Sequence, residues 1–161
     1  MSTAWVGPDP VAFVLQEAEL LDSGQLEAWN GLFAPEGHYW LPLGNWARDP
    51  RLEASHVYDD HLLREVRIAR LRSRQAHSQQ PPGACHHLLQ QPRLVRADAI
   101  EGRCELRTAF LYTELRAGHT VSLPGVAWHH LRLMDGALRI VLKRVDLLHA
   151  AEALPAVEFY P

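Results

Sequence analysis

The sequence predicts an α+β fold in which helices come first and a curved antiparallel sheet follows. Apolar residues recur at helical spacing in the first half of the chain, whereas alternating apolar and polar residues are typical of the second half. The chain has 161 residues, which is enough to bury one hydrophobic core without cross-links. Because the helices precede a run of hairpin-connected strands, they should pack on one side of the sheet.

Two helices are expected after a loose arm at residues 1–8. Asp9-Pro10 begins the first helix, because Asp is a good N-cap and Pro suits the first helical position. Gly24 ends this helix, and a second short helix over residues 26–33 follows it. Pro35 stops the second helix, so the sheet is expected to begin beyond it.

A strand, a long loop and a third helix are predicted next. Residues 38–43 form the strand, and residues 44–58 form the loop because they show no clear period. Asp59 or Asp60 caps the helix, which runs to about Arg72. The residues of this helix expected to face the core are Leu62, Val66 and Ala69, and those expected to point outward are Arg64, Arg67, Arg70 and Arg74.

Long antiparallel strands are predicted for the second half. Residues 86–96 form one strand that Pro92 interrupts, and residues 104–113 form the next. A further strand over residues 120–133 should contain a bulge at Pro124-Gly125.

The last strand should follow a tight turn. Asp135-Gly136 lies between two alternating runs, which is a strong hairpin signal. Residues 138–142 continue the alternation, and residues 147–161 form a tail. With no internal repeat and no linker, the whole chain, residues 1–161, is expected to be a single domain.

The composition argues against several classes of partner. The formal charge is −3 and the sequence pI is about 6.3, so neither nucleic acid nor an acidic surface is an expected partner. No membrane association is expected, because no stretch approaches the roughly 18 apolar residues of a membrane span. The N-terminus has no signal-peptide pattern. Two cysteines, Cys85 and Cys104, do not define a disulfide framework, so a cytoplasmic protein is expected.

Several segments, taken in order, carry a family resemblance. They are Phe13–Asp22 followed by Trp29, then His38–Leu43, Asp59–Arg74 and Leu131–Arg144. Together they resemble the β (small) subunit of Rieske-type aromatic-ring-hydroxylating dioxygenases. The resemblance spans roughly residues 10 to 150, and its specificity lies in the ordered set.

This resemblance implies a fold, an assembly and a role. The fold would be the cone-shaped α+β fold that is nuclear-transport-factor-like, cystatin-like and ketosteroid-isomerase-like. The chain would form a homotrimer that carries catalytic α subunits in a hetero-hexamer. The Rieske iron–sulfur cluster and the mononuclear iron are then expected in the α subunit, and no cofactor, metal or catalytic residue is expected here. The role would be to support a dioxygenase in aromatic catabolism.

The residues themselves do not supply iron ligands in the expected patterns. A Rieske cluster needs two cysteines and two histidines at tight spacing, which Cys85-His86 and the isolated Cys104 do not provide. His86-His87 and His129-His130 lie on predicted strands, where neighbours point to opposite faces, so an adjacent pair does not readily hold one ion. A metal site using Cys85, His86 or His130 is kept as the minor alternative.

Two other functions are open on the same fold. A stand-alone acid–base enzyme of the isomerase or dehydratase type, or a small-ligand-binding module, would use polar residues inside the cone. The candidates for such a cavity are His38, Asp59, Asp60, His86 and His130. A helix start is the competing structural role for the two aspartates.

Subunit contacts are expected at tryptophan and arginine side chains. Trp5 lies in the arm and Trp46 in the long loop, where neither has an obvious burial site, and aromatic residues are enriched at protein interfaces. Trp128, Arg67 and Arg70 complete the set of interface candidates. Local packing of the tryptophans and a solvated helix face for the arginines are the alternatives.

Overall fold

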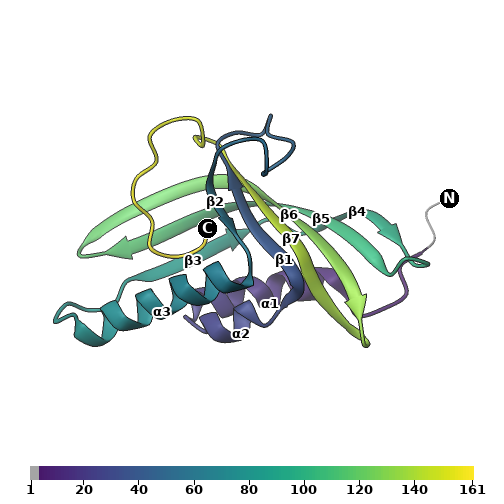
Figure 1. Cartoon of the computed structure of the whole chain (residues 1–161), viewed down its shortest axis with the longest axis horizontal. Coiled ribbons are helices and arrows are strands. Elements are labelled where there is room, and N and C mark those ends of the chain that lie inside the picture. The colour runs from purple at the N-terminus through teal and green to yellow at the C-terminus, as the bar shows by residue number, and fades with distance from the viewer. Residues whose placement is uncertain (1–3) are drawn as a thin grey trace.

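The computed structural model describes residues 4–161, and Figure 1 shows their arrangement. The helices are α1 (Pro10–Asp22), α2 (Leu26–Asn30) and α3 (His61–His77). The strands are β1 (Phe33–Pro42), β2 (Ser55–Asp59), β3 (Ala84–Leu89), β4 (Arg93–Asp98), β5 (Arg103–Arg116), β6 (His119–Met134) and β7 (Ala137–Leu147). Within the described range, no helix is long and apolar enough to cross a membrane.

All the strands of this range belong to one curved sheet. Its seven strands follow the order β2-β1-β7-β6-β5-β3, and β4 also pairs with β5. β3 and β4 pair with opposite halves of β5, so they share one edge of the sheet. β1 and β7 run parallel, and the other pairs are antiparallel.

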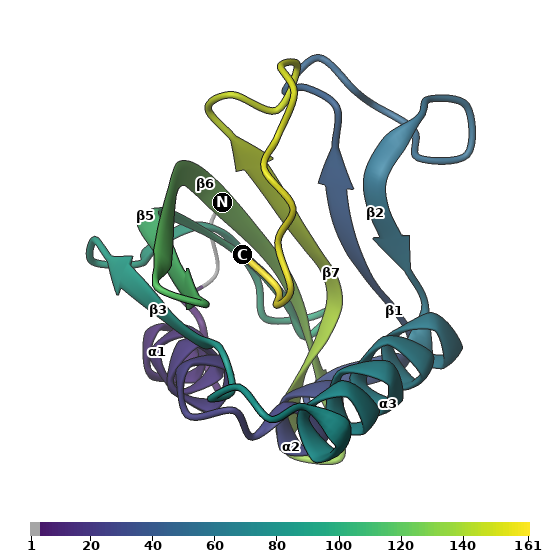
Figure 2. The ribbon, with the colours of Figure 1, turned by 90° about the vertical axis from the view of Figure 1, so that its left-hand side faces the viewer.

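The helices lie on the concave face of the sheet, as Figure 2 shows. Trp29 from α2, Tyr39 from β1 and Leu106 from β5 are fully buried between the two layers. The chain beyond β7 also enters the concave side and buries Phe159 and Tyr160 there. The predicted α+β class, with N-terminal helices on a curved sheet, is confirmed.

The first helix begins and ends as predicted, but the next boundary differs. Asp9 caps α1 by accepting a hydrogen bond from the Val11 N–H at 2.9 Å. The second helix ends at Asn30, and β1 already begins at Phe33. The expectation that Pro35 ends a helix is wrong, because Pro35 lies inside β1. The sequence pattern also missed β2, which takes residues 55–58 of the predicted loop into the sheet.

The predicted inner face of α3 is wrong. Leu62 and Val66 are exposed, whereas Arg64, Ile68 and Leu71 are buried at i, i+4 and i+7 spacing. Arg64 is tolerated inside because its guanidinium donates to Asn30 Oδ1 at 2.6 Å and to backbone carbonyls. A hydropathy pattern treats arginine as outward, so the predicted inner face of this helix lies two residues before the observed one.

The last hairpin is confirmed, but the predicted bulge is in the wrong place. Asp135 and Gly136 both have positive φ, 50° and 80°, as a type I′ turn requires. β5 and β6 pair without a shift through Pro124-Gly125. The shift lies between His130 and Leu131, opposite Val141, which is the extra residue of β7. From this point on, the alternation of β7 is offset by one residue.

Candidate functional site

The outer face of the sheet carries a broad open groove of about 810 Å³. Two tryptophans from distant segments border it, Trp46 from the loop after β1 and Trp128 from β6. Trp46 is 56% exposed, which is unusual for a large aromatic side chain. The charged side chains of the groove are those of Arg48, Glu105, Arg107, His130, Arg144 and Asp146.

Arg144 on β7 holds the Trp46 loop against the sheet. Its guanidinium donates to the carbonyl oxygens of Ala47 at 2.8 Å and Asn45 at 3.2 Å. The same guanidinium donates to Asp146 Oδ1 at 2.9 Å and lies 4.5 Å from the centre of the Trp40 ring. The exposed tryptophan is therefore carried on a loop with a defined position.

His130 contributes little positive charge to the groove. Burial lowers the pKa of His130, the Glu105 carboxylate raises it in part, and the Arg144 guanidinium lowers it further. The net pKa lies below the ordinary value for histidine. The groove is thus a mixed surface of aromatic rings and paired charges, which suits a protein partner better than a small anion.

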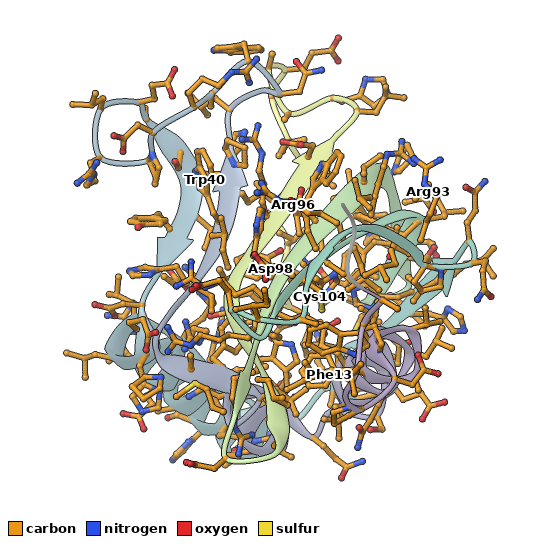
Figure 3. All side chains as sticks on the ribbon, turned by 90° about the vertical axis from the view of Figure 1, so that its right-hand side faces the viewer. Phe13, Trp40, Arg93, Arg96, Asp98 and Cys104 are labelled. Carbon is orange, nitrogen blue, oxygen red and sulfur yellow. The ribbon has the colours of Figure 1, made fainter. Side chains whose placement is uncertain are left out.

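A second hollow of about 540 Å³ lies beside β4 and shares Glu105 and His130 with the groove. Figure 3 labels Arg96 and Asp98, which line it from β4, together with Cys104 from β5. β4 is an edge strand with Val95 49% exposed, so this end of the sheet is also uncovered.

The concave side contains a buried ion pair. Lys143 Nζ donates to Glu17 Oε1 at 2.6 Å, and the Trp29 indole N–H donates to the same oxygen at 2.7 Å. Burial raises the pKa of Glu17, but the charges of Lys143 and His129 outweigh it and hold the pKa well below its usual range. Burial lowers the pKa of His129, whose ring lies 3.5 Å from the Glu17 carboxylate. Lys143 and Trp29 therefore hold the Glu17 carboxylate in the core, whereas neither ring nitrogen of His129 has a hydrogen-bond partner within the described residues.

Asp22, Cys85 and His87 form the one group of three potential metal ligands found within residues 4–161. His87 Nδ1 lies 2.6 Å from Asp22 Oδ1, and His87 Nε2 lies 3.1 Å from the Tyr160 carbonyl oxygen. Burial, followed by the Asp22 charge, raises the pKa of the Cys85 thiol to about 12. Because both ring nitrogens are hydrogen-bonded and the thiol is held protonated, the arrangement fits a hydrogen-bond network better than a metal centre.

The structure brings only Asp59 of the proposed cavity residues into the cone. Its carboxylate pairs with Arg67 at 2.8 Å. Asp60 instead caps α3 by accepting from the Leu63 N–H. His38 stacks on Tyr58 on the outer side of β1, His130 lines the outer groove, and His86 is exposed on β3. Their strand neighbours Tyr39, His129 and His87 face inward instead.

The interface candidates lie in different surroundings. Trp46 and Trp128 share the outer groove. Trp5 folds back on the arm, where its indole N–H donates to the Pro8 carbonyl at 2.9 Å. Arg70 is exposed, whereas Arg67 is partly buried and ion-paired with Asp59.

The inward-facing polar residues were missed for a common reason. Glu17, His87, His129 and Lys143 are charged or polar residues that a hydropathy pattern assigns to the surface. The strict alternation of Leu106, Thr108 and Phe110, once paired with β6, would have placed His129 opposite Leu106 and hence inside.

The family described as ring hydroxylating beta subunit matches residues 16–151. This chain belongs to that family. The match covers most of the chain, so the resemblance drawn from the ordered motifs is confirmed and the predicted identity as a ring-hydroxylating dioxygenase β subunit is correct.

Two relatives show how far the family likeness extends. The β subunit is 33% identical over 133 residues to the small oxygenase component of the p-cumate 2,3-dioxygenase system of Pseudomonas putida, covering 81% of this chain and 73% of that protein. It is 30% identical over 152 residues to the 2-halobenzoate 1,2-dioxygenase small subunit of Burkholderia cepacia, covering 88% and 90%.

Solved structures support the fold of the β subunit. The β subunit of benzoate 1,2-dioxygenase from Burkholderia mallei matches with a TM-score of 0.77 at 20% identity, over 98% of this chain and 99% of that one. An NTF2-like protein with a cystatin-like fold from Novosphingobium aromaticivorans matches with a TM-score of 0.55 at 18% identity, over 84% and 77%. The predicted cone fold is confirmed by both.

Proposed function

We propose that this β subunit is not catalytic and acts on a dioxygenase through its outer surface. The proposal rests on the observation that one side of the sheet is filled by the chain's own residues and the other side is open. The helices and the tail residues 154–161 occupy the concave side, whereas Trp46 and Trp128 border an open groove on the outer side. A chain whose interior is filled by its own residues can influence a reaction mainly through contacts with other subunits.

The proposed partner is a catalytic α subunit. In this proposal the α subunit holds the Rieske iron–sulfur cluster and the mononuclear iron, and this chain holds no cofactor. Both ring nitrogens of His87 are hydrogen-bonded, one to Asp22 and one to the Tyr160 carbonyl oxygen, which supports the proposal that this chain holds no metal there. The chain would act in the cytoplasm as a single domain, residues 1–161, without nucleic acid or membrane as a partner.

The proposed assembly is a homotrimer of this chain that carries three α subunits in a hetero-hexamer. Trp46 and Trp128 are the first candidates for the contacts, because they are aromatic, adjacent to one groove and only partly buried. Trp5 and Arg70 are further candidates. Arg67 is a weaker one, because its guanidinium is already paired with Asp59.

The substrate of the complex is proposed to be a single-ring aromatic compound. The names of the relatives specify p-cumate, 2-halobenzoate and benzene as the compounds on which their systems act. The relatives that cover most of this chain are named for carboxylated rings. Benzoates are therefore the first compounds to assay.

Co-expression with a candidate α subunit tests the proposal. We expect the α subunit to require this chain for soluble assembly and for oxygen consumption with a benzoate, while the chain alone turns over nothing. An α subunit that is fully active without this chain would contradict the supporting role. Turnover of a small carbonyl or hydroxylated compound by the isolated chain would favour the acid–base enzyme instead.

A further inference from the structure

The chain's own C-terminal residues fill an aromatic slot inside the cone. Phe159 and Tyr160 are 8% and 3% exposed, although no helix or strand holds them there. The Tyr160 ring lies 4.5 Å from the Trp29 ring and 4.7 Å from the Tyr39 ring, measured between centroids. Figure 2 shows this segment running down the concave side of the sheet.

The polar contacts of this segment are those that a small phenolic carbonyl compound would make. The Tyr160 hydroxyl donates to Asp59 Oδ2 at 2.9 Å. The Tyr160 carbonyl oxygen accepts from His87 Nε2 at 3.1 Å, and the Pro161 main-chain oxygen accepts from the Tyr39 hydroxyl at 2.6 Å. One phenol and two main-chain oxygens thus satisfy an acceptor and two donors of the cone wall.

The His87 donor is oriented without help from the C-terminal residues. Asp22 Oδ1 lies 2.6 Å from His87 Nδ1, and both oxygens of Asp22 accept from the His87 backbone N–H at 3.0 Å. This pair fixes the ring with Nε2 toward the interior. A donor that is held in place before a ligand arrives costs less entropy to use than a mobile one.

The C-terminal segment lies outside the sheet. Residues 151–161 make no backbone hydrogen bond to any of the described strands, and their inner end is held by Glu114, which accepts from the N–H groups of Glu158 and Phe159 at 3.0 Å. A cavity of about 250 Å³ lies between this segment and the wall formed by β1, β2 and α3, with Tyr39, His56 and Arg67 among its lining residues.

We propose that the cone interior is a binding site for small phenolic carbonyl compounds, and that Phe159–Pro161 is its intramolecular occupant. The site is separate from the outer groove and does not depend on the α subunit. Its walls are Trp29 and Tyr39, and its polar groups are His87 and Asp59 together with the Tyr39 hydroxyl.

An intramolecular occupant weakens the binding of any free ligand. A tethered group competes at an effective concentration on the order of millimolar or higher, so the complete chain should bind a phenolic carbonyl compound poorly. Removing the occupant should strengthen the apparent affinity by about tenfold or more.

The test titrates N-acetyl-tyrosine amide into a chain shortened to residues 1–158. Isothermal titration calorimetry measures the binding. We expect one saturable site in the shortened chain and at least about tenfold weaker binding by the complete chain. A shortened chain that is folded by circular dichroism but gives no saturable heat overturns the proposal. Equal affinity of the two chains also overturns it.

Matched variants of the shortened chain separate this site from the rest of the surface. His87→Gln removes the ring donor in its oriented form and should reduce the affinity, whereas Arg74→Ala on the exposed side of α3 should leave it unchanged. Loss of binding in both variants, or in neither, contradicts the assignment of the site.

A second variant keeps the test decisive if the shortened chain does not fold. Tyr160→Ala in the complete chain removes only the ring, and p-cresol has the size and hydroxyl group to occupy the vacated slot. We expect p-cresol to raise the melting temperature of Tyr160→Ala and not that of the unchanged chain. If p-cresol leaves the melting temperature of Tyr160→Ala unchanged, the phenolic site is ruled out.

Discussion

At the scale of residues, the buried pair of Glu17 and Lys143 illustrates how a polar core is made stable. Each residue is 2% exposed, and Lys143 Nζ lies 2.6 Å from Glu17 Oε1. Lys143→Met leaves the Glu17 charge buried without its partner, so we expect the free energy of unfolding to fall by about 3–5 kcal/mol. Urea denaturation measures this, and Glu17→Leu combined with Lys143→Met should recover much of the loss. A Lys143→Met loss below about 1 kcal/mol would mean that water reaches the pair.

The same pair predicts a pH dependence of stability. The pKa of Glu17 is lower in the folded chain than its ordinary value of 4.5, so its contribution to stability is present above that value and is lost as the pH falls below it. We expect urea midpoints to fall more steeply with acidification in the natural chain than in the double variant. Parallel acid profiles for the two chains would contradict the assignment.

Arg64 offers a second residue-scale test. It is fully buried, and its guanidinium lies 3.8 Å from the centre of the Phe33 ring. Arg64→Ala leaves buried acceptors such as Asn30 Oδ1 unsatisfied, so we expect a loss of about 3 kcal/mol or more. Arg74→Ala, on the exposed side of the same helix, is the matched control and should stay within about 0.5 kcal/mol. Similar losses in both variants would show that helix propensity, not burial, sets the effect.

At the scale of elements, the start of α3 depends on one carboxylate. Asp60 accepts from the Leu63 N–H at 2.9 Å, which satisfies one of the unpaired amides of the first turn. We expect Asp60→Ala to lower the free energy of unfolding by about 1 kcal/mol and Asp60→Asn to preserve most of it. Thermal unfolding of the two variants measures the difference, and equal losses would assign the effect to charge alone.

The sequence predicted the ends of those helices and turns that depend on one or two neighbouring side chains. The cap at Asp9, the cap at Asp59 or Asp60 and the turn at Asp135-Gly136 were predicted because caps and turns need particular side chains at particular positions. The inner face of β7 could not be found in this way, because the extra residue Val141 turns Lys143 inward. Arg64 was missed because its partners on α2 and β1 are distant in the sequence.

The candidate site was only partly predictable for the same reason. The sequence marked Trp46 as an aromatic residue without an obvious burial site and Trp128 as an interface candidate, but their meeting at one groove depends on the sheet topology. The inward direction of His87 and His129 depends on strand register, which a single sequence leaves open by one residue.

At the scale of the whole molecule, the filled interior and the open outer face predict an assembly defect. Trp46→Ala combined with Trp128→Ala should weaken the proposed trimer without unfolding the chain, because neither ring belongs to the buried core. Light scattering should show a smaller mass, while circular dichroism stays unchanged. A variant trimer as stable as the natural one would place the contacts elsewhere on the molecule.

The most direct test of the account is native mass spectrometry with metal analysis on this chain, alone and co-expressed with an α subunit. The account predicts a complex with equal numbers of the two chains, and iron that stays with the α subunit when the chains are separated. A chain that remains apart from every α subunit, or that retains stoichiometric iron when purified alone, would contradict it.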